Sequence, residues 1–378
     1  MADINDRPKK KAKVAGPPAP KFLASSALSF PLLRSQFFCS EVCVCSDFIV
    51  IGEKDVREKA FVRMRTYLSG GSSAAKANEE RIEGNEAEEE EEEAWQAIRS
   101  WQPDDRLAPT ELAKMWQGLY YNFWMSDKPL VQQTLADELA LLALSVRSTT
   151  SLSTTRRHAY DYAAATCYMK AFWQTVTREW SNLDKHRLDK FYLLVRRFVH
   201  VHFLLLVRAN FHPVALEQLR DVLCAKGGPL DVADTKCPAS LTYHVADIYV
   251  DELEKALANP LDPSIASSQT NTTTTTLPIQ LLVRPFDNVL LNATSKVMYE
   301  RVLNNVYVPL IEAALGSDQE QANYPVIIRK SRTSENDSND KVAEAILERL
   351  FESASAKEVS DVPRKRLYTF CRKYNYPK

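Results

Sequence analysis

The residues closest to a metal-binding set are three cysteines near the N-terminus, Cys39, Cys43 and Cys45. A structural zinc site needs four ligands in a tetrahedron, and the sequence around these cysteines offers no histidine or second cysteine pair to complete one. His200 and His202 are two residues apart, which on a helix separates their side chains by about 200°. Because neither group completes a ligand set, the sequence predicts no metal site.

Acid–base chemistry has no stronger support in this sequence. Glu179 and Asp189 could form a carboxylate pair, but each stands beside Arg or Lys, which keeps a carboxylate ionised. Only 9 glycines occur in 378 residues, and none of them builds a phosphate-binding loop or the strained turn that presents a catalytic serine. We therefore expect no catalytic residue, no cofactor and no enzymatic activity.

Basic residues are the better candidates for function. Lys190 and Arg197 are seven residues apart, two turns of one helix, and Arg208 returns to the same side, so the three could form a basic stripe that follows a phosphate backbone or meets an acidic partner. The alternative is a solvated or ion-paired face, with Asp184 and Asp189 as partners. The full set of candidate RNA- or partner-binding residues is Lys128, Lys185, Arg187, Lys190, Arg196, Arg197 and Arg208.

Four tryptophans accompany these cations. Trp116, Trp124, Trp173 and Trp180 fall on apolar stripes at helical spacing, which favours core packing over a role as exposed base-stacking platforms.

The formal net charge of -1 hides an uneven distribution. The segment Glu79 to Glu93 holds ten Glu and one Arg, and without it 47 basic residues face 39 acidic ones, a net charge of +8. A basic body of this kind suits a phosphate-rich partner. Near the N-terminus, Lys9, Lys10, Lys11 and Lys13 form a cluster typical of a nuclear localisation signal, which implies a nuclear import receptor as a partner.

Helical periodicity covers most of the chain. Apolar residues recur every three or four positions from Val56 to Tyr67, and Gly70 and Gly71 end this helix. An apolar stripe from Leu112 to Trp124 predicts the next helix, and Leu135–Val146 predicts another. Further helices are predicted at about 157–181, 184–209, from Pro213 to Gly227, from Pro238 to Ala258, and at about 284–291, 294–315, 341–353 and 361–374. No segment reaches the about 20 uninterrupted apolar residues that cross a membrane.

These elements predict an all-α fold of antiparallel helix pairs, either an α-solenoid of the HEAT or armadillo kind or an irregular helical domain. We expect a disordered basic tail with an atypical insertion at 1–52, a helical domain at 53–315, a linker at 316–340 and C-terminal helices at 341–378. The Glu-rich stretch at 71–94 is expected to be a loop, because such a composition cannot bury a core.

Two motifs together resemble the eukaryotic ribosomal RNA processing protein 1 family. The first is Trp124-Met125-Ser126-Asp127-Lys128-Pro129, and the second runs from Arg187 through Leu188-Asp189-Lys190-Phe191-Tyr192 to Arg196-Arg197-Phe198. The resemblance covers about 53–70 and 107–315, with a weaker likeness in the C-terminal helix. Three features depart from the family pattern: the inserted-looking segment 26–51, the Glu-rich stretch, and the absence of the long basic tail that many relatives carry.

The resemblance implies a helical, nucleolar assembly factor of the pre-60S ribosomal particle. Its partners would be precursor ribosomal RNA and other assembly factors, and its role that of a non-catalytic scaffold required for processing. Two alternatives stay open, a ribonuclease acting on the ribosomal RNA spacer and a helical transport adaptor. A ribonuclease needs metal-binding carboxylates or an acid–base pair in a cleft, and the sequence suggests neither.

Overall fold

The computed structural model describes residues 54–71, 85–150, 154–258, 276–293, 295–316, 323–332 and 338–376. The chain divides into two units, Met1–Val44 and Cys45–Lys378, and all described residues belong to the second. Within them every regular element is helical and no β-strand occurs, which confirms the predicted all-α class. The lysines of the predicted localisation signal, the cysteine cluster and the predicted tail at 1–52 lie outside the described residues.

The helices agree closely with the predicted periodic segments. In chain order they are α4 (Lys54–Leu68), α5 (Asn85–Ala97), α6 (Pro109–Met125), α7 (Pro129–Leu141), α8 (Thr154–Glu179), α9 (Leu188–Arg208), α10 (Pro213–Cys224), α11 (Ala239–Ala258), α13 (Ile279–Leu282), α14 (Pro285–Asn292), α15 (Lys296–Val302), α16 (Val308–Leu315), α17 (Pro325–Ser331), α18 (Asp340–Ser355) and α19 (Asp361–Lys373). A π-helical turn, Leu303–Tyr307, joins α15 to α16. Proline occupies the first turn of α6, α7, α10, α14 and α17, where its missing N–H costs no helical hydrogen bond.

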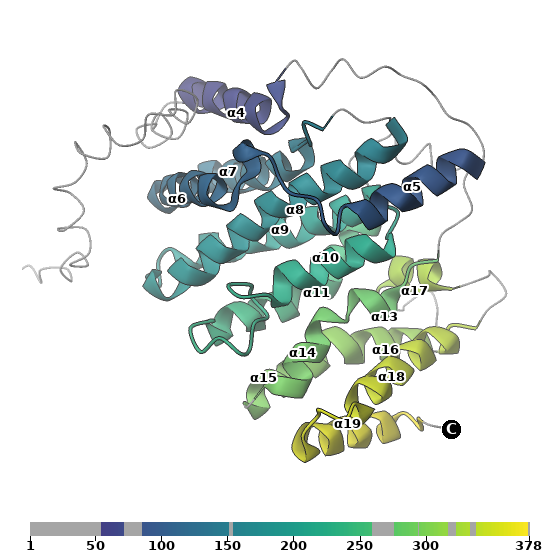
Figure 1. Cartoon of the computed structure of the whole chain (residues 1–378). Helices are drawn as coiled ribbons and strands as arrows, with labels where there is room; N and C mark the ends of the chain where they lie inside the picture. Colours follow the sequence, from purple (N-terminus) through teal and green to yellow (C-terminus); the bar gives the residue numbers. More distant parts are fainter. Residues whose placement is uncertain are drawn as a thin grey trace, which may run out of the picture. The chain divides into compact units, whose positions relative to one another are not determined.

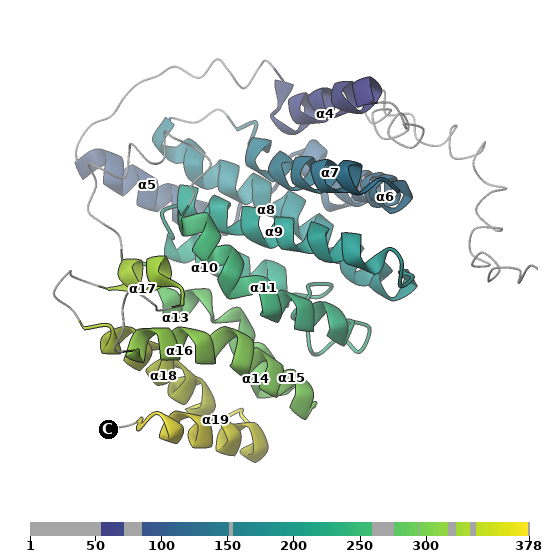
Figure 2. The same cartoon turned by 180° about the vertical axis from the view of Figure 1, so that it is seen from behind.

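The helices of the second unit stack in two layers (Figure 1). One layer contains α6, α8, α10 and α14, and α5 packs on α8 and α10. The other layer contains α7, α9, α11, α15 and α16, which face the viewer in Figure 2. Successive helices alternate between the layers, which is the arrangement of an α-solenoid. The C-terminal helices α18 and α19 pack on α14 and α16, and so continue the same stack.

Helix α9 lies at the centre of this stack. It contacts α7, α8, α10 and α11, and 13 of its residues are buried. Phe198 stacks on Phe172 of α8 with ring centroids 3.6 Å apart, and Trp116 of α6 meets the edge of the same ring. The side chains of Trp116, Trp173 and Trp180 are buried, as the apolar stripes predicted, whereas Trp124 is partly buried.

The prediction of a loop across the whole Glu-rich stretch at 71–94 was wrong in its second half. Residues Asn85–Ala97 form α5, and Ala94, Trp95 and Ile98 are buried against the body. Glu is a strong helix former, and the apolar residues that follow the Glu run supply the buried contact. The predicted loop ended at residue 94, just before Trp95 and Ile98, and so left out the side chains whose burial holds this helix in place. Residues 72–84 lie outside the part that the structure describes.

The predicted linker at 316–340 also contains a helix, α17. Ile327 and Ile328 bury their side chains, and the carboxylate of Glu254 on α11 accepts hydrogen bonds from the backbone N–H groups of Val326 and Ile327, both at 2.9 Å. An acidic side chain satisfies the free N–H groups of a helix start and suits its dipole. Because the cap comes from a residue far away in the sequence, local pattern could not reveal this helix.

Docking of α5 can be tested through Trp95. Replacing Trp95 by Ala should lower the free energy of unfolding by about 3–5 kcal/mol, because it empties the site of a fully buried indole. Glu89→Ala, an exposed change on the same helix, should stay within about 0.5 kcal/mol. Urea denaturation followed by circular dichroism measures both, and equal stability of the two variants would contradict the docked position of α5.

Candidate interaction surfaces

The two motifs that carry the family resemblance meet in the folded chain. The Nζ atom of Lys190, at the start of α9, donates hydrogen bonds to the backbone oxygens of Trp124 and Ser126 at 2.6 and 2.7 Å. The guanidinium of Arg187 lies 3.7 Å from the centre of the Trp124 ring, and its Nε donates to the Trp124 oxygen at 3.3 Å. The start of α9 therefore holds the turn between α6 and α7.

Lys190 is consequently not a surface residue. Its side chain is only 6% exposed. Burial, and next the nearby charge of Arg187, lower the pKa of Lys190 to about 8. The prediction that Lys190 belongs to a solvent-facing basic stripe was wrong, because the spacing of residues on a helix does not show which face packs against neighbours.

The arginines of α9 also have partners within the protein. Arg196 forms an ion pair with Glu252 of α11 at 2.8 Å, and Arg197 pairs with Asp137 of α7 at 2.7 Å. Arg208 donates to the backbone oxygen of Leu144 at 3.0 Å. These contacts join α9 to its neighbours in the stack. They correspond to the ion-paired alternative to a phosphate-binding stripe, but the carboxylates are Glu252 and Asp137 and not the expected Asp184 and Asp189.

Glu252 is the most deeply buried of these carboxylates, with 1% of its surface exposed. Burial by itself raises the pKa of Glu252, but hydrogen bonds from His200, Lys255 and Arg196 outweigh it and lower the pKa to about 2. A charge buried this deeply is tolerated only because it is paired. Glu252 is thus a structural anchor between α9 and α11.

Three candidates from the predicted set, Lys128, Lys185 and Arg187, do not belong to α9. Lys128 and Lys185 are exposed and stand in the α6–α7 turn and the α8–α9 loop. Arg187 is partly exposed, but it is held by the Trp124 ring and by an ion pair with Asp184. Lys128 and Lys185 are the members of the set that remain accessible to a partner.

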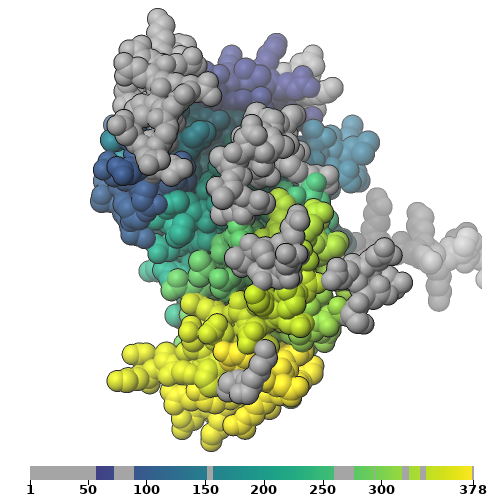
Figure 3. Space-filling view, turned by 90° about the vertical axis from the view of Figure 1, so that its right-hand side faces the viewer, coloured from purple at the N-terminus to yellow at the C-terminus, as the bar shows by residue number. Residues whose placement is uncertain are grey.

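A further basic surface in the described residues was not among the predicted candidates. It lies on α19, the last helix of the stack, which with α18 forms the surface at that end of the body (Figure 3). Lys365 and Arg372 are exposed and seven residues apart, so they share one helix face. Neither forms an ion pair with any residue that the structure describes. We call Lys365, Arg366, Arg372 and Lys373 the α19 basic face.

Aromatic side chains accompany this basic face. The Arg366 guanidinium lies 5.5 Å from the Tyr299 ring centre, and the Lys373 ammonium lies 5.0 Å from that of Tyr374. The pattern is present in the sequence, where Arg364-Lys365-Arg366 is followed by Arg372-Lys373, with Tyr368 and Phe370 between them. This combination of cations and aromatic rings is typical of surfaces that bind nucleic acid backbones and bases.

Two kinds of feature are absent from the part of the chain that the structure describes. No three His, Cys, Asp or Glu side chains there are grouped so that they could hold a metal ion. None of the described helices combines the length and apolar character of a membrane span.

A comparison with protein families shows which family the chain belongs to. A family model described as "Nucleolar protein, Nop52" matches residues 49–370. The chain belongs to this family. The match confirms the predicted resemblance and the expected nuclear and nucleolar localisation, and it extends through α18 into α19.

Named relatives agree with this assignment. The chain is 26% identical over 301 residues to "Ribosomal RNA processing protein 1 homolog A" of Homo sapiens, covering 70% of this chain and 61% of the relative. It is 29% identical over 203 residues to the human homolog B, covering 54% of this chain and 21% of the relative. A Dictyostelium discoideum homolog is 26% identical over 287 residues, covering 72% and 52%. The chain thus spans less than two thirds of the length of these relatives.

The structural role of Lys190 leads to a stability prediction. Lys190→Met keeps the apolar stem but removes the charged donor to the oxygens of Trp124 and Ser126. Arg187 and Gln132 still donate to these oxygens, so the expected cost is that of lost charge-assisted hydrogen bonds, about 1.5–3 kcal/mol. Lys185→Met removes the same charge from an exposed position nearby and should cost less than about 0.5 kcal/mol. Chemical denaturation distinguishes the two variants. A Lys190→Met protein as stable as wild type would restore Lys190 as a candidate for RNA contact.

Proposed function

We propose that the protein is a non-catalytic scaffold in ribosomal RNA processing, acting on the pre-60S particle through precursor ribosomal RNA and other assembly factors. The names of its relatives support a role in ribosomal RNA processing. A stack of helices in two layers offers long surfaces on which several partners can dock at once. The lysine cluster Lys9–Lys13 fits entry into the nucleus through an import receptor.

The observation that carries this proposal is the α19 basic face. Every cation of the central helix α9 that was a candidate for RNA binding is engaged inside the protein, whereas Lys365 and Arg372 have no carboxylate partner in the described residues. A phosphate backbone supplies such partners and releases its own counterions on binding, which drives association. We assign the direct RNA contact to this face, with Lys128 and Lys185 as a second, smaller contact.

A ribonuclease is the less favoured reading. The described residues include three buried carboxylates, and each is hydrogen-bonded to neighbours. Glu252 contacts Arg196, Lys255 and His200, Asp287 contacts Tyr307, Arg349 and Ser353, and Asp231 accepts from the backbone N–H groups of Ala233 and Asp234. A hydrolytic site instead needs carboxylates that face a substrate. Incubating the protein with spacer RNA and Mg²⁺ tests this alternative, and cleavage at a single site would overturn the scaffold proposal. A transport adaptor would share the solenoid but not the two family motifs.

The RNA contact can be tested by charge reversal on α19. The double variant Lys365→Glu/Arg372→Glu should weaken binding to a precursor large-subunit RNA fragment, and the slope of log K against log salt should decrease by about 1.5 units, since each phosphate contact contributes about 0.7–0.9. The measurement is fluorescence anisotropy over a series of salt concentrations, with circular dichroism as a check of folding.

The matched control is Lys226→Glu/Lys236→Glu. Both lysines are exposed and lie between α10 and α11, so this variant changes the net charge equally at a different place. If both double variants lose affinity equally, the effect reflects net charge alone, and the assignment of RNA contact to α19 is wrong.

A further inference from the structure

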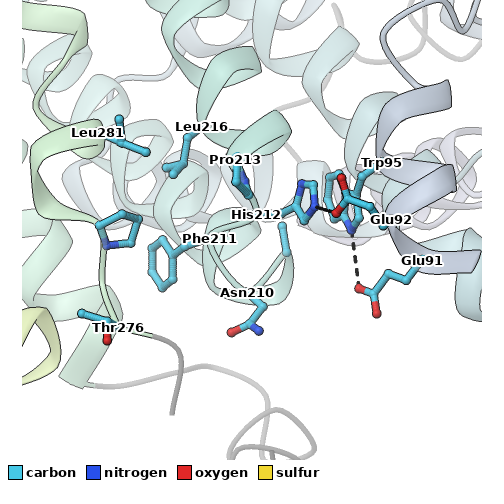
Figure 4. Close-up of a pocket in the computed structure, with 12 residues that line it drawn as sticks. Glu91, Glu92, Trp95, Asn210, Phe211, His212, Pro213, Leu216, Thr276 and Leu281 are labelled. Carbon is cyan, nitrogen blue, oxygen red and sulfur yellow. Dashed lines mark hydrogen bonds and ion pairs between the residues drawn. The ribbon is translucent and has the colours of Figure 1, made fainter. Parts of the chain in front are cut away.

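A pocket of about 430 Å³ opens between three segments that are far apart in the sequence. Figure 4 shows α5, the turn between α9 and α10, and the segment from Thr276 to Leu281 around it. The volume lies within the range of about 300–1,000 Å³ that is usual for ligand sites. None of the residues of the basic α19 face or of the two family motifs lines this pocket.

Aromatic and apolar side chains form its walls. The indole of Trp95 stacks on the imidazole of His212 with ring centroids 4.5 Å apart and planes 11° from parallel. Pro213 lies next to this pair, and Phe211 and Leu281 line the other side of the pocket (Figure 4). Trp95 itself is buried, so the partly exposed rings at the pocket are those of Phe211 and His212. The electron-rich face of the Phe211 ring can attract a cation.

The backbone that presents Phe211 is held in a rare conformation. Asn210 and Phe211 both have left-handed dihedrals, with φ of 47° and 52°. The turn is fixed by hydrogen bonds from the Phe211 N–H to the Leu206 oxygen at 2.9 Å and from the Asn210 N–H to the Val207 oxygen at 3.1 Å. These bonds end α9 in a Schellman motif. The aromatic wall is therefore formed before any ligand arrives.

The polar groups at the mouth are acidic. Glu92 accepts a hydrogen bond from Nε2 of His212 at 2.9 Å, because Nδ1 of that ring accepts from the Val214 N–H. Glu91 contacts only the indole N–H of Trp95, at 3.5 Å, and has no ion pair with any described residue. No Lys or Arg lines the pocket. An anion would meet repulsion here, whereas a cation would find a carboxylate and aromatic faces together.

We propose that this pocket binds a Lys or Arg side chain from a basic peptide segment of a protein partner. The charge of the Glu-rich helix α5 selects a cationic segment, and the pocket receives one of its side chains. The acidic mouth disfavours the phosphates that flank an RNA base, so a protein is the occupant. The proposal does not depend on RNA contact by α19, and it gives the Glu run a binding role.

The test uses the full chain and a fluorescein-labelled peptide of alternating Arg and Ala, with a Lys and Ala peptide as a second probe. Glu91→Gln removes a carboxylate partner of the cation, and Phe211→Asn removes an aromatic face. Each variant should weaken peptide binding about tenfold. Gln keeps an acceptor for Trp95, and Asn tolerates positive φ, so both variants should retain the fold, which circular dichroism verifies.

Glu93→Gln is the matched control. It removes the same charge from the same helix, but Glu93 faces Arg156 at 3.4 Å and does not line the pocket. Unchanged binding by Glu93→Gln alongside weaker binding by Glu91→Gln supports the proposal. Equal losses in the two variants would overturn it in favour of general attraction by α5. Tight binding of an oligouridine probe that Phe211→Asn abolishes would overturn it in favour of an RNA base.

Discussion

The buried ammonium of Lys190 ties the first residues of α9 to the turn that ends α6 and begins α7. Two backbone oxygens at this turn have no helical donor, because each lies at the end of a helix, and a cation satisfies both at once. The same contact fixes the position of α9, around which α7, α8, α10 and α11 pack. Ion pairs from Arg196 and Arg197 then secure α9 to α11 and α7.

This arrangement divides the basic residues into two groups by their surroundings. Inside the stack, cations face carbonyls and carboxylates of neighbouring helices and act on stability. On α19 they face solvent, because no further helix follows in the described residues to cover that side. The acidic helix α5 lies elsewhere, packed on α8 and α10. Opposite charges are thus held on separate surfaces, which gives one chain the means to contact RNA with one surface and a basic protein with another.

Much of the fold could be predicted from the sequence, because apolar periodicity and helix-starting prolines are local signals. The buried tryptophans followed from the same periodicity. The basic stripe could not be assigned in this way, since α9 is buried on most of its circumference and a seven-residue spacing says nothing about which side remains exposed. Helix α5 depends on the burial of its own Trp95 against the body, and α17 depends on hydrogen bonds to Glu254 of α11. Only the tertiary structure brings these partners together. The cations of the α19 basic face are adjacent in the sequence, but their lack of carboxylate partners among the described residues is a property of the folded chain only.

The central claim is that RNA meets the end of the helical stack and not its middle. Ultraviolet cross-linking of the native particle, followed by mass spectrometry of peptides that carry a nucleotide, tests this claim most directly. We expect cross-links in the segment Asp361–Tyr374, with aromatic residues such as Tyr374 as the reactive sites. Cross-links concentrated in Leu188–Arg208, with none in α19, would contradict the account.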